Sequence, residues 1–157
     1  MARVDFFDDP SAPRATTRIP GASAAVRDER GRLLLIRRED TGQWALPGGI
    51  FELDETIAEC AVRETREEAG VEIAVTGLVG IYTDPRHVAL LDDGRAIQPL
   101  GVCFHARPVG GEARPDGVET TAVAWVEPER LGEYELFPTH RERIADALSG
   151  SDQPRLA

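Results

Sequence analysis

GIFELDETIAECAVRETREEAGV, the stretch from residue 49 to residue 71, contains six glutamates. Three of them, Glu64, Glu67 and Glu68, have the spacing i, i+3, i+4, which places them on one face of a helix. Three like charges on one face repel one another unless a cation lies among them. Mg²⁺ and Mn²⁺ are hard ions that prefer carboxylate oxygens and keep coordination positions open for phosphate. The alternative is a solvated acidic helix face, which is the usual meaning of a charge run.

The same stretch follows a wider pattern, G-x5-E-x7-R-E-U-x-E-E-x-G-U, in which U is aliphatic. This pattern resembles the signature of the Nudix hydrolase family, and eight of its nine defined positions match. These positions are Gly49, Glu55, Arg63, Glu64, Thr65, Glu67, Glu68, Gly70 and Val71. Thr65 stands where the family has an aliphatic residue, and Asp54 stands where many members have glycine. Neither is a metal ligand in the family, and Thr65 on the apolar stripe would need a hydrogen bond, such as one to a helix carbonyl.

The resemblance implies a hydrolase of pyrophosphate linkages that depends on Mg²⁺ or Mn²⁺. Glu67 and Glu68 match the positions that bind the metal most often, and Glu64 matches a metal ligand or a water-activating base. The backbone carbonyl of Gly48 matches a position that can join the metal shell, and Glu55 matches a supporting ligand or an outer carboxylate. Such ions neutralise phosphate oxygens and lower the pKa of bound water.

Two further roles are open. Arg63 has Glu59 and Glu67 one helical turn to either side, so we expect it to orient carboxylates rather than to bind phosphate. Members of the family often take another carboxylate from outside the signature. Glu119, just before the apolar stretch at 120–126, is the first candidate and Glu112 is the second. An ordinary exposed position is an equal alternative for both, because exposed glutamate is common.

The whole chain has 157 residues, 41% of them hydrophobic, and a formal net charge of -10. This length supports one domain with a real core. The acidic balance disfavours duplex nucleic acid as a partner, because a phosphate backbone needs a basic footprint. Cys60 and Cys103 lie in apolar patterns, which favours buried thiols over a disulfide. We find no signal-peptide pattern and no apolar run long enough to cross a bilayer, so we expect a cytoplasmic protein without membrane contact.

Local patterns predict an alternation of strands and helices. A helix is expected from Asp54, as its N-cap, to Ala69, where Gly70 ends it in a left-handed conformation, and a second helix is expected at 139–148. Strands are expected at 19–26, 32–38, 44–47, 71–82, 98–108 and 120–126, with a turn at 28–31 and a loop at 83–97. We expect a flexible arm or edge extension at 1–17, one domain at 18–150 and a tail at 151–157. This order indicates a mixed sheet between helical layers.

The resemblance makes that fold class more specific: an α/β/α sandwich in which the signature forms a loop–helix–loop. For the substrate, Pro85 lies downstream of the signature, close to where ADP-ribose pyrophosphatase members carry a proline. We therefore favour a nucleoside diphosphate linked to another moiety, such as ADP-ribose or a nucleotide sugar. The alternatives are MutT-type cleavage of a nucleoside triphosphate and a non-catalytic nucleotide-binding module, which the complete carboxylate set disfavours. A small nucleotide is the expected partner, and a homodimer is left open.

Overall fold

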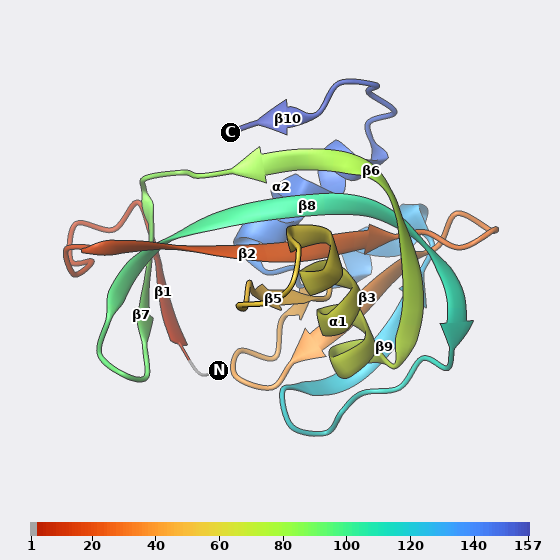
Figure 1. Ribbon diagram of the computed structural model, residues 1–157, viewed down its shortest axis with the longest axis horizontal. Coiled ribbons are helices and arrows are strands. Elements are labelled where there is room, and N and C mark those ends of the chain that lie inside the picture. Colours follow the sequence, from red (N-terminus) through yellow and green to blue (C-terminus); the bar gives the residue numbers. More distant parts are fainter. Residues whose placement is uncertain (1–2) are drawn as a thin grey trace.

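The computed structural model describes residues 3–157, and its centre is a pair of long parallel strands (Figure 1). β2 (Thr17–Val26) runs beside β8 (Ala96–Gly111) over its whole length, from Thr17 opposite Ile97 to Val26 opposite Ala106. On the other edge of β8 lie β7 at its start and β6 along most of the remainder. The seven-stranded sheet is completed by β1, β5 and β10; its other bounds are β1 Arg3–Phe7, β5 Gly48–Ile50, β6 Val71–Tyr82, β7 His87–Leu91 and β10 Arg155–Leu156.

A smaller antiparallel sheet has the order β4 (Trp44–Ala45), β3 (Leu33–Arg38) and β9 (Thr120–Val126). Leu33, Leu34 and Leu35 of β3 are all fully buried, so both faces of this strand contact the core. A continuous apolar run of this kind is typical of a strand covered on two sides. The short 3-10 helix η1 (Pro128–Glu133) follows β9 and leads toward the last helix.

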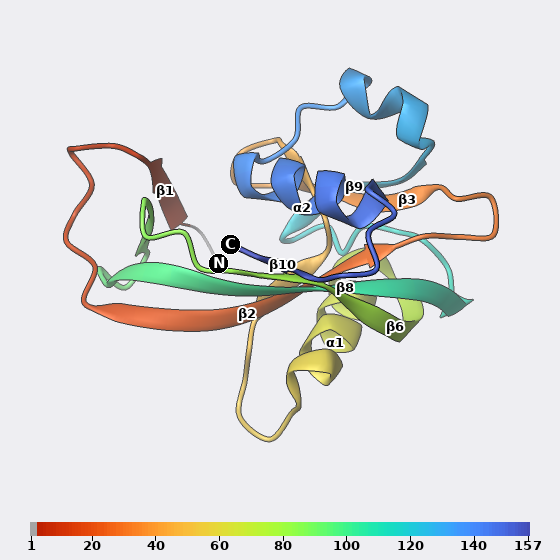
Figure 2. The same cartoon turned by 90° about the horizontal axis from the view of Figure 1, so that it is seen from above.

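The two α-helices, α1 (Ile57–Ala69) and α2 (Pro138–Leu148), lie on opposite sides of the long sheet (Figure 2). α1 buries Cys60 and Ala61 against one part of the core, and α2 buries Ile144 and Ala147 against another. This arrangement confirms the predicted mixed sheet between helical layers. Both cysteines are free thiols and buried, and no helix among residues 3–157 is long and apolar enough to span a membrane.

The signature helix begins two residues later than predicted. Thr56 is the N-cap, and its hydroxyl accepts a hydrogen bond from the Glu59 backbone N–H while the Glu59 carboxylate accepts one from the Thr56 N–H. This reciprocal capping box fixes the helix start. Asp54 instead has a φ of 64°, the left-handed region in which glycine is favoured, so this position suits the glycine found in many family members. Gly70 ends the helix with a φ of 72°, as predicted.

Thr65 is fully buried on α1, and its hydroxyl donates to the Ala61 carbonyl at 2.7 Å. The expected hydrogen bond to a helix carbonyl is therefore present. The departure from the aliphatic pattern changes local packing and leaves the hydroxyl with a partner inside the core.

Pairing between distant segments accounts for the strands that local patterns missed. The expected loop at 83–97 contains β7, which forms a hairpin with the start of β8 around Gly94, whose φ is 86°. β1 lies within the expected arm at 1–17 and pairs with β7, from Arg3 opposite Leu91 to Phe7 opposite His87. β10 lies in the expected tail and pairs with β6. β1 and β10 each depend on a partner strand that is far away in the sequence, whereas β7 pairs both with its hairpin neighbour β8 and with the distant β1.

Candidate active site

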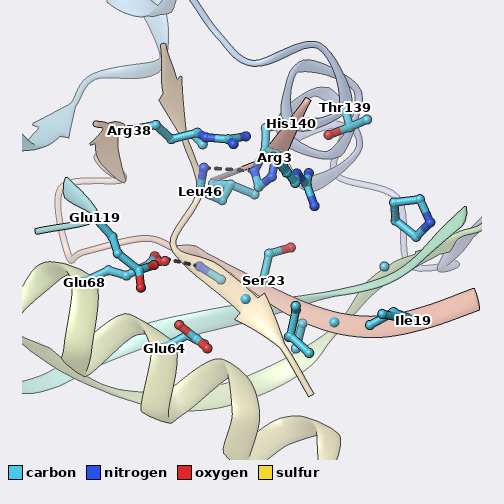
Figure 3. A pocket seen from close by; sticks show the side chains of 18 of the residues that line it. Arg3, Ile19, Ser23, Arg38, Leu46, Glu64, Glu68, Glu119, Thr139 and His140 are labelled. Carbon is cyan, nitrogen blue, oxygen red and sulfur yellow. Dashed lines mark hydrogen bonds between the residues drawn. The ribbon is translucent and has the colours of Figure 1, made fainter. Parts of the chain in front are cut away.

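A cavity of about 570 Å³ opens where the signature, the β2–β5 pair and the start of α2 meet (Figure 3). Two groups of opposite charge stand out in its lining, which also includes Arg63 among the carboxylates and Glu39 and Asp40 beside Arg38. Carboxylates from α1 and the segments beside it form the acidic wall, which consists of Glu52, Glu64, Glu67, Glu68 and Glu119. Cations from β1, β3 and α2 form the basic wall, which consists of Arg3, Arg38 and Arg143. Ser23, Gly48 and Gly49 also line the cavity, and Figure 3 shows Ser23 between the two walls.

Arg63 is the centre of the acidic wall. Its Nε and Nη2 donate to the two oxygens of Glu55, each at 2.8 Å. Its Nη1 donates to Glu64 at 2.8 Å and to Glu67 at 3.2 Å. The Arg63 bonds lower the pKa of Glu55 to about 2, and the same contacts raise the pKa of Arg63. The structure thus places Arg63 against three signature carboxylates.

Glu59 does not join this cluster, although the helical spacing predicted that it would flank Arg63. Its carboxylate lies in the capping box instead, where it accepts from the Thr56 N–H at 2.6 Å. Glu55, which comes from the segment before the helix, occupies the place beside Arg63. The physical reason is that a residue in the first helical turn has an unsatisfied backbone N–H within reach.

Glu68 is the most enclosed carboxylate of the acidic wall, with 7% of its surface exposed. The backbone N–H of Gly48 donates to its Oε2 at 3.0 Å. Burial raises the pKa of Glu68 well above its usual range, and the charges of Glu64 and Glu119 raise it further. Burial also raises the pKa of Glu64, which packs so closely on Gly49 that a Cβ there would lie 2.4 Å from its carboxylate.

The two candidates for an additional carboxylate are in different places. Glu119 lines the cavity, lies beside Glu68 in Figure 3 and raises the pKa of both Glu64 and Glu68. Glu112 directly follows β8, its backbone N–H donates to the carbonyl of Gly70 at the end of α1, and it does not line the cavity. Only Glu119 is therefore placed to act together with the signature carboxylates.

The acidic wall has the chemistry of a hard-cation site. The charge of Glu119 disfavours the ionised forms of Glu64 and Glu68, and the charge of Glu64 adds to this effect at Glu68; a divalent ion would relieve this repulsion. Within residues 3–157, no three Asp, Glu, His or Cys side chains already converge at metal-binding distance. Arg63 accounts for part of this spacing, because its Nη1 holds Glu64 and Glu67. The donor set fits Mg²⁺ or Mn²⁺ once these side chains turn toward a common point.

Sequence patterns did not reveal the basic wall. Arg3, Arg38 and Arg143 are far apart in the chain, and no motif connects them. Arg38 stacks on the Phe137 ring, with 4.2 Å from its Cζ to the ring centroid, and Arg3 lies 5.9 Å from the same centroid. The fold brings these cations together through β1, β3 and α2.

His140, on α2, is a further residue of the cavity lining whose position the sequence did not predict. The Leu46 backbone N–H donates to its Nδ1 at 3.0 Å, which requires an unprotonated nitrogen there. Burial, together with the positive charges of Arg143, Arg38 and Arg3, holds the pKa of His140 well below its usual range. The folded protein therefore contains a neutral imidazole near three arginines.

This neutral His140 predicts a pH dependence of stability. An unfolded histidine titrates near pH 6.5, whereas the folded one binds its proton only at lower pH. The free energy of unfolding should therefore have its full value above pH 6.5. It should decrease as the pH falls below 6.5, by at most about 1.4 kcal/mol per pH unit. Urea unfolding of the wild type and His140→Asn at pH 7.5 and 5.5 would measure this. Equal pH slopes in the two proteins would contradict it.

The NUDIX domain model matches residues 17–147. A MutT-like protein of Streptomyces ambofaciens is 37% identical over 90% of this chain and 86% of its own length. A putative 8-oxo-dGTP diphosphatase of Bacillus subtilis is 34% identical over 83% of this chain and 80% of its own. An ADP-ribose pyrophosphatase of Methanocaldococcus jannaschii is 41% identical over 57% of this chain and 51% of its own.

Solved structures give the same result for the fold. The crystal structure of an ADP-ribose pyrophosphatase from Streptococcus suis has a TM-score of 0.66 and 26% identity, over 88% of this chain and 96% of that one. A NUDIX hydrolase from Nitrosomonas europaea has a TM-score of 0.71 and 21% identity, over 92% of this chain and 78% of that one. The fold described above is thus shared with these solved structures.

Proposed function

Because this chain belongs to the NUDIX family and is a Nudix hydrolase, we propose that it cleaves a pyrophosphate linkage in a small nucleotide with the help of Mg²⁺ or Mn²⁺. The observation that carries the proposal is one cavity in which an acidic wall, held by Arg63, faces a basic wall. A metal ion and a polyphosphate need these two environments side by side, because the ion is bound by carboxylates and the remaining phosphate charge by cations.

The carboxylates of the acidic wall would have a different role from the Glu55–Arg63 pair beside them. Glu64, Glu67 and Glu68 would hold the ion, with Glu119 and the Gly48 carbonyl completing its ligands. Glu55 and Arg63 would position these carboxylates, since Arg63 bonds Glu55 through two nitrogens and Glu64 through a third. The bound ion would neutralise phosphate oxygens and lower the pKa of water at the scissile linkage.

A nucleoside triphosphate is our first candidate substrate. The MutT-like protein and the putative 8-oxo-dGTP diphosphatase match 90% and 83% of this chain. Pro85, the residue that favoured ADP-ribose, gives little support to that substrate, because it does not line the cavity. Its carbonyl accepts a hydrogen bond from the Gln98 side chain. ADP-ribose or a nucleotide sugar is the second candidate, supported by the ADP-ribose pyrophosphatase of M. jannaschii, which is 41% identical over a shorter region.

Product identity would test both parts of the proposal. With Mg²⁺, a nucleoside triphosphate should yield nucleoside monophosphate and pyrophosphate, and ADP-ribose should yield AMP and ribose phosphate in smaller amounts. Chelation with excess EDTA should abolish turnover, and added Mg²⁺ should restore it. Ion chromatography of the products identifies and quantifies them for each substrate, and so shows which of the two substrates is cleaved faster.

Three results would count against the proposal in different ways. Undiminished turnover in EDTA would contradict metal dependence. Faster cleavage of ADP-ribose than of any triphosphate would reverse the order of candidates. Nucleotide binding without any product from either class would support the non-catalytic module.

A further inference from the structure

Arg143 of α2 is the most under-coordinated cation of the cavity lining. Among residues 3–157, its Nε is the one buried side-chain nitrogen or oxygen without a hydrogen-bond partner. Its Nη1 makes a long contact of 3.5 Å to the Ser23 hydroxyl. Its Cζ lies 5.2 Å from the Tyr82 ring centroid, a cation–π contact that satisfies none of the guanidinium N–H groups in the usual way.

The other two arginines of the basic wall each have a carboxylate partner. Arg3 Nε lies 3.0 Å from Asp5 Oδ2, and Arg38 Nη2 lies 2.6 Å from Asp40 Oδ2. In the part of the chain that the structure describes, Arg143 has no carboxylate oxygen within 4.0 Å of its guanidinium. Burial disfavours its charged form and lowers its pKa, and Arg3 acts in the same direction. An arginine nevertheless stays protonated in proteins, so the charge is retained at a cost.

The surrounding backbone is shaped to keep the guanidinium at this wall. A Cβ on Gly101 would lie 2.3 Å from Arg143 Nη2, so the glycine leaves room for the side chain. Tyr82, on which the guanidinium stacks, is itself fixed by donating to Asp146 at 2.7 Å. Arg143 is half-buried and lines the cavity, and ionisable groups perturbed by their surroundings in this way cluster at functional sites.

We propose that Arg143 is the anion-binding residue of the cavity and that it binds a phosphate group of the substrate other than those held at the acidic wall. The inference rests on the proposed function and makes its substrate class more specific. The substrate would be a nucleotide that carries a charged phosphate in addition to the phosphates bound at the acidic wall. Ser23 and Gly48 connect the two ends of the cavity, because Ser23 contacts Arg143 and pairs with Gly48, whose N–H bonds Glu68. A chain of phosphates over this floor would meet carboxylate-bound metal at one end and a guanidinium fork at the other.

Binding of inorganic triphosphate in the presence of Mg²⁺, measured by isothermal titration calorimetry, tests this role through affinity rather than through nucleotide turnover. Arg143→Met should weaken binding roughly tenfold or more, the order expected when a charge-assisted hydrogen bond is lost. The affinity of Arg143→Lys should lie between those of the wild type and Arg143→Met, because lysine keeps the positive charge but lacks the forked N–H donors of the guanidinium. Arg141→Met is the matched control on the same helix, since Arg141 is exposed and lies outside the cavity lining, and it should bind like the wild type.

A stability measurement separates binding from folding. Removing a charge that lacks a counter-ion should leave the melting temperature of Arg143→Met level with the wild type or above it. Wild-type affinity in a folded Arg143→Met would overturn the proposal, as would a wild-type protein that does not bind triphosphate at millimolar concentration. Unchanged triphosphate affinity with weakened binding of a free nucleoside would also overturn it, in favour of base recognition. If the protein binds triphosphate through Arg143 and yet cleaves no nucleotide, the proposed function fails while this inference stands.

Discussion

Glu68→Gln is expected to reduce turnover at least about a hundredfold while the metal-free protein stays as stable as the wild type or becomes more stable. Turnover falls because a neutral amide is a poor ligand for a hard divalent ion. Stability does not fall because burial and the neighbouring Glu64 and Glu119 already disfavour the Glu68 charge. The amide oxygen can still accept the hydrogen bond from the Gly48 N–H.

Turnover with saturating Mg²⁺ and thermal unfolding in EDTA would measure the two effects separately. Glu67→Gln is a useful comparison, because 53% of the Glu67 side chain is exposed. It should lose activity as well, with little change in melting temperature, since an exposed carboxylate is already solvated. A sharp drop in the melting temperature of Glu68→Gln would mean that this carboxylate is structural, as a plain acidic helix face would predict.

Arg63→Ala is expected to lower both activity and stability. It removes the donor that contacts Glu55, Glu64 and Glu67, along with a 3.1 Å bond to the Ile50 carbonyl. Breaking an enclosed ion pair on one side costs about 3 kcal/mol, because the remaining charges lose their counter-ion. Turnover should fall too, since Glu55, Glu64 and Glu67 would lose the donor that orients them.

Arg66→Ala is the matched control, because Arg66 lies one turn later on α1 with 56% of its side chain exposed and only a 3.9 Å contact to Glu72. Its unfolding free energy should stay within about 0.5 kcal/mol of the wild type. Urea unfolding of both variants in EDTA, with turnover measured in Mg²⁺, gives the comparison. Full activity in a destabilised Arg63→Ala would restrict Arg63 to a folding role.

The three carboxylates of the acidic wall that lie on α1 could be predicted from the sequence, because they are close in the chain and helical geometry relates them. Glu119 comes from a distant segment and was one of two open candidates, and Glu52 was not predicted. The spacing of Glu64, Glu67 and Glu68 is a property of one helix, and a single turn connects Arg63 to Glu67. The same geometry gave one wrong neighbour, Glu59, because competition from the helix N-terminus is not visible in spacing alone. The start of the helix was misplaced for a related reason, since both Asp54 and Thr56 are acceptable N-caps by residue type.

The basic wall could not be predicted, because its geometry depends on tertiary structure. Arg3 reaches the cavity only through the pairing of β1 with β7, and Arg143 only through the packing of α2 on the long sheet. An isolated arginine in sequence is most often a solvated surface residue. That an arginine lacks a hydrogen-bond partner becomes apparent only in the folded structure, as the Nε of Arg143 illustrates.

The two walls also differ in how the chain anchors them. The acidic wall stands on α1, which is capped at both ends and packed on the core, so it opens only when a large part of the molecule unfolds. Arg3 stands on β1, a five-residue strand at the sheet margin whose ladder runs to β7 alone. Margins of sheets fray at a lower free energy than their centres. The part of the cavity wall that Arg3 forms is therefore expected to open at a lower free energy than the part formed by α1, so that local opening there would widen the cavity while Glu64, Glu67 and Glu68 keep their positions.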